Sequence, residues 1–225
     1  MYFPTHTSVT SVAVGHPPGT SLLPYHPHAG QKPVLVWGSS IAQGGVVQNA
    51  GMTWPVSMGR ILDREVLNFG FSGACQMQPA VAKYLGELKP EVFVVDCLPN
   101  MDAASVTELA APLIKQLRVA LGPTVPLVFL EGHTYSNAWI LPEVASGQAA
   151  KRAAQLRAVQ AAQATDKHLH YVSGDGKLAS LGETQYDATA GVGVHPTNIA
   201  HLRIAQFVSD QLQNILPGRL GVNSK

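Results

Sequence analysis

Short runs of apolar residues alternate with longer amphipathic stretches from Pro33 to near the end of the chain. Such short runs, bounded by glycine, proline or charged residues, are typical of buried strands. The strands expected on this basis cover Val34–Trp37, Glu65–Phe69, Val92–Asp96, Leu127–Glu131 and His168–Val172. Because a helical stretch separates each strand from the next, the pattern predicts parallel βαβ units. We therefore expect an α/β fold, a flavodoxin-like three-layer α/β/α sandwich with a five-stranded parallel sheet.

The helical stretches carry apolar residues at the spacing of one helix face. In the third of them, Leu109, Leu113 and Leu117 follow one another at intervals of four residues. Pro112 lies in the same stretch and predicts a kink or a late helix start, because proline lacks the main-chain donor. The helices expected are roughly 54–62, 79–88, 105–121, 146–165 and 198–216, the last one ending at Pro217-Gly218.

The first 32 residues lack this alternation and contain five prolines and four histidines. An alternating run near Ser8 to Val14 predicts one short strand in an otherwise irregular arm. No carboxylate or cysteine accompanies the histidines at ligand spacing, so no metal site is predicted. The expected organisation is an arm over 1–32, one α/β domain over 33–216 and a tail over 217–225.

The composition excludes some classes of partner. The net charge is +1 and charged residues make up 13% of the chain, so no electrostatic surface for nucleic acid or an anionic membrane is expected. Hydrophobic residues make up 46%, which favours some uncovered apolar surface and makes a homo-oligomer a hypothesis. Neither a membrane span nor a secretory signal is present in this sequence. We expect a cytoplasmic protein by default, with a signal on a longer precursor left open.

Four short segments carry groups suited to acyl transfer. Gly38-Ser39-Ser40-Ile41 follows the first expected strand, at the sheet edge where open parallel sheets carry their sites. Asn68–Gly73 and Asp96–Asn100 could donate hydrogen bonds to an oxyanion, and Val192–Pro196 contains a histidine that could act as a base. The order serine, glycine, asparagine, histidine resembles the SGNH hydrolases, the GDSL-type esterases and lipases. Residues 38–45 match neither a P-loop nor a dinucleotide fingerprint, and no cofactor is expected.

The resemblance implies a role for each segment. The family nucleophile is the third residue of a Gly-Asp-Ser pattern, which implies Ser40, with Ser39 in place of the aspartate. The implied oxyanion hole consists of the N–H groups of Ser40 and Gly73 and the side-chain amide of Asn100, and the implied base is His195. Each residue also has a structural interpretation on its own: serine as a helix N-cap, glycine as a turn, asparagine as a cap.

The catalytic acid departs from the family pattern, which places an aspartate three residues before the histidine. Position 192 is Val, whose side chain cannot accept a hydrogen bond, whereas an acid normally holds the imidazole in the required tautomer. Three explanations remain: a Ser–His dyad oriented by a backbone carbonyl, a carboxylate from elsewhere, or lost activity. Asp187 is the nearest replacement, and Asp175 and Glu131 are more distant candidates.

Residues 41–45, 96–101 and 134–139 resemble one bacterial branch of the family, which often carries a small β-sandwich domain ahead of the hydrolase domain. The resemblance covers residues 33–216, whereas residues 2–15 resemble only the closing strands of that extra domain. The branch contains carbohydrate and short-chain acyl esterases. It therefore implies a serine esterase that forms an acyl-enzyme from a small-molecule or carbohydrate ester, foremost an acetyl ester. A binding protein that has lost the acid, and an acyltransferase, are the alternatives.

Four polar residues, at the end of the fourth expected strand and in the segment after it, share the same sheet edge. Glu131, Tyr135 and Asn137 are candidate substrate contacts there, and His133 is a further candidate, with loop packing an equally good interpretation of all four.

The two cysteines, Cys75 and Cys97, adjoin the two oxyanion segments and could lie within reach of one another. Their number and spacing fit neither a metal site nor a dense disulfide framework. Two free, buried thiols are the favoured expectation.

Overall fold

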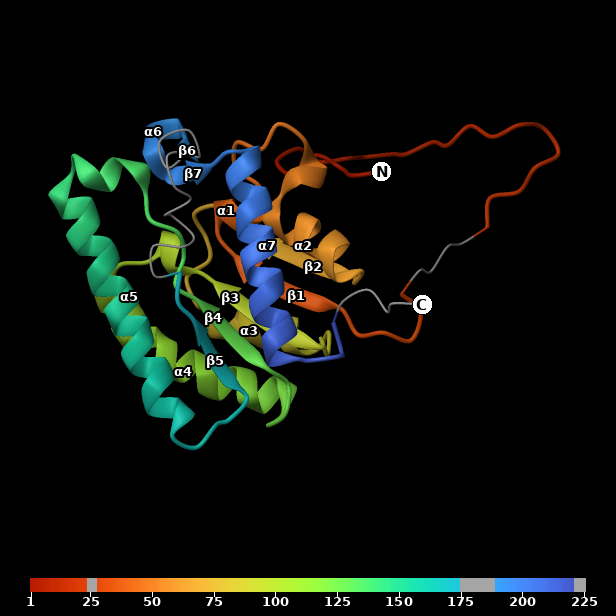
Figure 1. Cartoon of the computed structure of the whole chain (residues 1–225). Helices are drawn as coiled ribbons and strands as arrows, with labels where there is room; N and C mark the ends of the chain where they lie inside the picture. Colours follow the sequence, from red (N-terminus) through yellow and green to blue (C-terminus); the bar gives the residue numbers. More distant parts are fainter. Residues whose placement is uncertain (24–27, 175–188, 221–225) are drawn as a thin grey trace.

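The computed structural model describes residues 1–23, 28–174 and 189–220. Five parallel strands form one sheet in the order β2-β1-β3-β4-β5, with helices on both faces (Figure 1). The expected flavodoxin-like sandwich is confirmed, and every strand bound agrees with the sequence prediction to within one residue. The strands are β1 (Val34–Gly38), β2 (Val66–Gly70), β3 (Val92–Asp96), β4 (Leu127–Leu130) and β5 (Leu169–Val172).

The five expected helices are present, and several short elements join them. The long helices are α2 (Trp54–Leu62), α3 (Pro79–Gly86), α4 (Ala103–Leu121), α5 (Pro142–Gln163) and α7 (Asn198–Ile215). The short elements are α1 (Ser40–Gln43), α6 (Gly191–Val194), the 3₁₀ helices η1 (Ala50–Met52), η2 (Leu98–Asn100) and η3 (Ser136–Trp139), and a hairpin of β6 (Thr189–Ala190) and β7 (His195–Pro196).

Helix α4 does not start late, as Pro112 had suggested. It begins at Ala103 and continues through the proline to Leu121. The carboxylate of Asp102 accepts a hydrogen bond from the N–H of Ser105 at 2.7 Å and caps the first turn. An N-cap satisfies main-chain donors that the helix leaves open, which favours the earlier start.

The core lies on both faces of the sheet. Val36 and Val94 pack with α2 and α7 on one face, whereas Leu35 and Phe93 pack with α3, α4 and α5 on the other. All four side chains are fully buried. Burying such a side chain stabilises the fold by roughly 1.5–3 kcal/mol. Because both faces of these strands are buried, apolar residues occupy consecutive positions along them. The carboxyl ends of all five strands meet at one edge, and the loops after β1, β2, β3 and β4 lie there.

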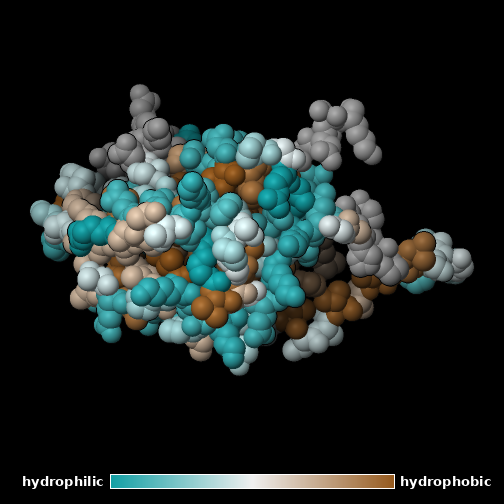
Figure 2. All heavy atoms as spheres, turned by 90° about the horizontal axis from the view of Figure 1, so that it is seen from below, coloured by the Kyte–Doolittle hydropathy of each residue, from teal (hydrophilic) through white to brown (hydrophobic). Residues whose placement is uncertain are grey.

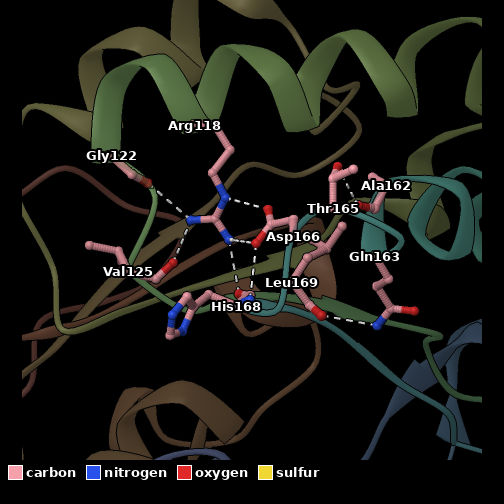
Figure 3. Close-up of polar contacts among 9 residues, drawn as sticks. All are labelled: Arg118, Gly122, Val125, Ala162, Gln163, Thr165, Asp166, His168 and Leu169. Carbon is pink, nitrogen blue, oxygen red and sulfur yellow. Dashed lines mark hydrogen bonds and ion pairs between the residues drawn. The ribbon is translucent and has the colours of Figure 1, made fainter.

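A charged cluster closes the opposite, amino edge of the sheet (Figure 3). The guanidinium of Arg118, on α4, donates to both carboxylate oxygens of Asp166, at 2.5 and 3.1 Å. It also donates to the main-chain oxygens of Gly122, Val125 and His168. One side chain therefore ties together the loops that enter β4 and β5. Because the N–H groups of Arg118 are hydrogen-bonded to acceptors within the protein, the cluster has a structural role.

The N-terminal arm runs beside the domain and then away from it (Figure 1). The strand expected near residues 8–14 does not form in the described residues, because no neighbouring strand pairs with it there. The arm exposes Phe3, Val9 and Val14, and hydrophobic residues lie along the segment that projects in Figure 2. The homo-oligomer and the preceding β-sandwich domain stay predictions. Within the described part of the chain, no helix is long and apolar enough to cross a membrane.

Candidate active site

The two serines after β1 have different roles in the structure. Ser39 is the N-cap of α1, and its Oγ accepts a hydrogen bond from the N–H of Ile41 at 3.2 Å. Ser40 is the first helical residue, and its Oγ lies 2.9 Å from Nε2 of His195. The competing interpretation as a cap therefore applies to Ser39, which leaves the hydroxyl of Ser40 facing the histidine.

Ser40 and His195 come together from segments 155 positions apart. Ser40 is 9% exposed and His195 is half-buried on β7. Gly45 lies against both residues. Its N–H donates a hydrogen bond of 2.7 Å to the main-chain oxygen of Ser40, and a Cβ added to Gly45 would lie 2.8 Å from Cδ2 of His195. Burial, and then the nearby His6, lowers the pKa of His195. The neutral imidazole, the form that can accept a proton, is thereby favoured.

Gly73 and Asn100 follow the two strands that flank β1. Asn100 ends η2, and its Oδ1 accepts a hydrogen bond from the N–H of Cys75 at 3.2 Å. The amide group is thereby oriented, and its NH₂ remains as a donor. Gly73 adopts a φ of 69°, in the left-handed region that glycine occupies without strain. No main-chain hydrogen bond from its N–H occurs within the described residues.

The expectation of two free thiols is wrong. Cys75 and Cys97 form a disulfide with a Cα–Cα distance of 4.9 Å, and both are fully buried. The reason is topological: Cys97 directly follows β3, Cys75 follows β2, and both strands pair with β1 and end at the same edge. The disulfide joins the loop of Gly73 to the segment of Asn100. In the sequence, the feature that indicated this proximity was the position of each cysteine after a predicted strand.

Gln43 was not singled out from the sequence as a site residue, yet it connects the arm to the loop of Gly73. Its Nε2 donates to the main-chain oxygen of Thr5 at 2.8 Å, and its Oε1 accepts from the N–H of Ser72 at 2.8 Å. The same Nε2 lies 3.1 Å from Nδ1 of His6. The first residues of the chain therefore lie at the rim of the site.

The loop between β4 and α5 contains the four residues proposed from the sequence. The carboxylate of Glu131 accepts a hydrogen bond from Ser173 at 2.8 Å. The N–H of Tyr135 donates to Gln148, and burial raises the pKa of Tyr135 to about 12. Nε2 of His133 donates to the main-chain oxygen of Val194 at 2.7 Å.

Asn137, the remaining member, lies in η3, where its main-chain N atom would be 2.8 Å from a Cβ added to Gly193. The loop thus touches the segment that carries His195, and substrate contact by its side chains stays a prediction.

No side chain of the described residues, 1–23, 28–174 and 189–220, makes a hydrogen bond with Nδ1 of His195, the ring nitrogen that a catalytic acid would bind. Asp187 and Asp175 lie outside the described residues. The alternatives set out from the sequence therefore stay open for the acid.

Asp96 is a buried carboxyl group that sequence reasoning noted only as part of an oxyanion segment. It ends β3, it is 5% exposed, and burial raises its pKa to about 7 against the attraction of Lys151. Lys151, on α5, is also buried, and its Nζ donates to the oxygen of Leu98 at 2.8 Å. Since Leu98 begins η2, this lysine supports the turn that ends at Asn100.

The described residues contain no group of three His, Cys, Asp or Glu side chains arranged to hold a metal ion.

A sequence model of the GDSL-like lipase/acylhydrolase family matches residues 31–213. The chain belongs to this family. No curated protein sequence matches it at a significant level.

Three solved structures share the fold of this GDSL-like chain. A protein from Bacteroides ovatus described as a GDSL-like lipase has a TM-score of 0.78 at 22% identity, over 89% of this chain and 57% of its own. A salicylyl-acyltransferase from a tetracycline biosynthetic pathway has a TM-score of 0.72 at 15% identity, over 85% of this chain and 57% of its own. A two-domain esterase active on acetylated mannans has a TM-score of 0.62 at 17% identity, over 83% of this chain and 49% of its own. The chain therefore spans about half of the length of these proteins.

Proposed function

We propose that this chain is a serine esterase that hydrolyses short-chain acyl esters, foremost acetyl esters, through an acyl-enzyme. The observation that carries the proposal is the 2.9 Å contact between Oγ of Ser40 and Nε2 of His195, in a chain of the GDSL-like lipase/acylhydrolase family. A serine hydroxyl is a poor nucleophile until a base removes its proton, and His195 is placed to accept it.

In the first half of the reaction, Oγ of Ser40 attacks the ester carbonyl carbon while Nε2 of His195 takes the hydroxyl proton. The N–H groups of Ser40 and Gly73 and the amide of Asn100 stabilise the tetrahedral oxyanion. As the first residue of α1, Ser40 has a main-chain N–H without a helical acceptor, which makes it available for this role. When the C–O bond breaks, His195 returns the proton to the leaving alcohol.

In the second half, water attacks the acyl group on Ser40 and gives its proton to His195. The second tetrahedral intermediate collapses, the carboxylic acid leaves, and Ser40 recovers its proton from His195. Each half transfers one proton through one imidazole. The lowered pKa of His195 supports this cycle, because a neutral base is required at the start of both halves.

The fold shared with an esterase of acetylated mannans supports a hydroxylated substrate. Asn100 lines a cavity of about 340 Å³, whose other lining residues are Gln76, Gln78, Pro79, Met101, Asp102, Ser105 and Leu109. Asn100 places this cavity next to the proposed oxyanion hole, whereas the side chains of Gln78 and Asp102 are already hydrogen-bonded to Ala74 and Ser105. We propose a carbohydrate as the alcohol part of the ester, because the fold is shared with an esterase active on acetylated mannans.

Acyl transfer to an alcohol is the second candidate, because the fold is shared with a salicylyl-acyltransferase. The two reactions differ only in the acceptor that attacks the acyl-enzyme. Products formed in the presence of competing alcohols separate them, since an acyltransferase yields mainly the new ester. A non-catalytic binding protein is the third candidate, and it rests on Val192 in place of the family aspartate.

The decisive experiment compares the wild type, Ser40→Ala and Ser39→Ala on p-nitrophenyl acetate and a fluorophosphonate probe. Ser40→Ala should abolish both turnover and labelling. Ser39→Ala should keep both and lose about 1 kcal/mol of stability, because it removes only the cap. A wild type that neither turns over nor labels would favour the binding protein, and an active Ser40→Ala would exclude the mechanism.

A further inference from the structure

The peptide bond that precedes His195 is held by a side chain from another part of the chain. Nε2 of His133 donates a hydrogen bond of 2.7 Å to the main-chain oxygen of Val194. We infer that His133 is a positioning residue for His195, which fixes the backbone of the base in the absence of a family aspartate at position 192. The inference rests on the proposed function only in naming His195 as the base.

His133 is suited to act as a fixed donor. It is 7% exposed, and burial lowers its pKa to about 4, so the ring is neutral near neutral pH. A neutral imidazole has one N–H, and the contact with a carbonyl oxygen assigns it to Nε2. The donor therefore stays in place over the pH range in which His195 acts as a base.

Helix α5 anchors the loop that carries His133. Nε2 of Gln148 donates to the His133 oxygen at 3.2 Å, and Nε2 of Gln155 donates to the Leu130 oxygen at 2.9 Å. Both glutamines are buried and lie on one face of α5. The ring of Tyr135 packs against the imidazole with a centroid distance of 5.4 Å. A loop held at several points can transmit its position to the segment that it contacts.

A second contact restrains the residue before Val194. Oγ of Ser136 donates to the oxygen of Gly193 at 3.3 Å. Gly193 has a φ of 78°, and a Cβ there would lie 2.8 Å from the N atom of Asn137, so the two segments approach more closely than other residues allow. The loop from β4 therefore holds two consecutive carbonyl groups ahead of the base.

The backbone of His195 is restrained on its other side by Pro196. A residue before proline is confined to extended conformations, because the proline ring clashes with the helical one. His133 holds the carbonyl group of Val194, and Pro196 limits the backbone conformation of His195 itself. Together these restraints fix the position of the His195 Cβ. Gly45 beside the ring and Oγ of Ser40 limit the remaining side-chain rotation. These contacts do part of what the acid does in a triad.

The test compares His133→Leu with His133→Gln in p-nitrophenyl acetate hydrolysis. Leucine removes the donor at similar volume, whereas the glutamine amide can place an N–H close to the position of Nε2. We expect kcat to fall roughly 10- to 100-fold in His133→Leu with KM unchanged, because misplacement of a catalytic group by about 1 Å costs rates of this order. His133→Gln should restore most of kcat. Equal losses in both variants would contradict the inference.

Imidazole rescue distinguishes positioning from general loss of structure. In His195→Gly, added imidazole replaces the base without a backbone link, so His133→Leu should not change the rescued rate. An equal fall of the rescued rate would show that His133 acts on the whole site and would overturn the inference. If His133→Leu does not fold, His133→Asn serves instead, because its shorter amide cannot reach Val194.

An NMR measurement on ¹⁵N-histidine-labelled protein does not depend on turnover. In the wild type, His195 should show the Nδ1–H tautomer, since Nε2 accepts from Ser40, and His133→Leu should convert it to an average of both tautomers. An unchanged His195 signal would overturn the inference even if the protein proves to be an esterase. Conversely, an inactive wild type with this change would reject the proposed function and keep the role of His133.

Discussion

The main-chain N–H of Cys75 donates a hydrogen bond of 3.2 Å to Oδ1 of Asn100. An amide whose oxygen is bound in this way directs its NH₂ away from that donor. The disulfide of Cys75 holds the same point covalently against the end of β3. The orientation of a proposed oxyanion donor is therefore built into the loop that also carries Gly73.

Replacing Asn100 by Asp should separate the two functions of its side chain. The aspartate keeps an oxygen for the N–H of Cys75 but loses the donor to the oxyanion. We expect kcat to fall about 10²- to 10³-fold, as for loss of one such donor elsewhere, with little change in Tm. Steady-state kinetics on p-nitrophenyl acetate measures the fall. Wild-type kcat in Asn100→Asp would remove this residue from the mechanism.

Loss of the disulfide should weaken both stability and activity. Cys75 and Cys97 are 22 positions apart, and closing a loop of this length stabilises by roughly 3 kcal/mol in the chain-entropy description. Urea unfolding of the Cys75→Ala/Cys97→Ala double variant should show this loss, and its kcat should be lower because the loop of Gly73 is less restrained. Reductant should lower the kcat of the wild type and leave the double variant unchanged. If both proteins respond equally, the disulfide does not support the site.

The pH dependence of kcat/KM should reflect the lowered pKa of His195. The base works as neutral imidazole, so activity falls as pH drops through its pKa, and the midpoint should lie below 6.5. Because the nearby His6 contributes to the lowering, His6→Ala should move the midpoint upward. His16→Ala is a suitable control, since His16 is exposed on the arm and bonds to Thr20. A midpoint above 6.5 in the wild type would contradict the electrostatics described.

Asp96 should make the protein less stable as the pH rises from about 4 to about 7. Its pKa is raised from 3.8 to about 7, so within this window the folded state keeps a proton that the unfolded state has released. The free energy of unfolding therefore falls across the window and is lowest above it. Asp96→Asn should remove this dependence and be more stable than the wild type at pH 8, by at most about 4 kcal/mol.

Urea unfolding at pH 4 and pH 8 measures this effect. Asp102→Asn is the matched control, because the pKa of Asp102 is lowered by its bond to Ser105 and its contribution is lost only toward acid pH. A difference between Asp96→Asn and the wild type that is the same at both pH values would be inconsistent with a buried protonated carboxyl group.

Gly45 should tolerate no side chain. A Cβ there would lie 2.8 Å from Cδ2 of His195 and 3.2 Å from the Ser40 oxygen, so Gly45→Ala must displace the imidazole. We expect a loss of kcat. Gly147→Ala in α5 is the control: nothing lies within 4 Å, and alanine should add roughly 0.5–1 kcal/mol of helix stability without changing kcat. Equal kcat in the two variants would mean that the ring position is not critical.

The strands, the long helices and the parallel fold could be read from the sequence because they depend on local periodicity. A buried strand needs a short apolar run and an amphipathic helix needs a stripe, and both patterns are visible without knowing what packs against them. Bounds moved by only a residue for the strands, and by up to four for the helices, where caps and packing decide the ends. The serine after β1 and the histidine before α7 were equally visible, because their segments resemble a family pattern.

Only the tertiary structure decided which positions far apart in the chain contact one another. The strand order places β2 and β3 on either side of β1, and this brings Cys75 to Cys97. The contact between Ser40 and His195 likewise joins positions 155 residues apart. The hydrogen bond from His133 to Val194 has no local pattern at all. Periodicity records which face of an element is buried, whereas such contacts depend on which loops the sheet brings to the same edge.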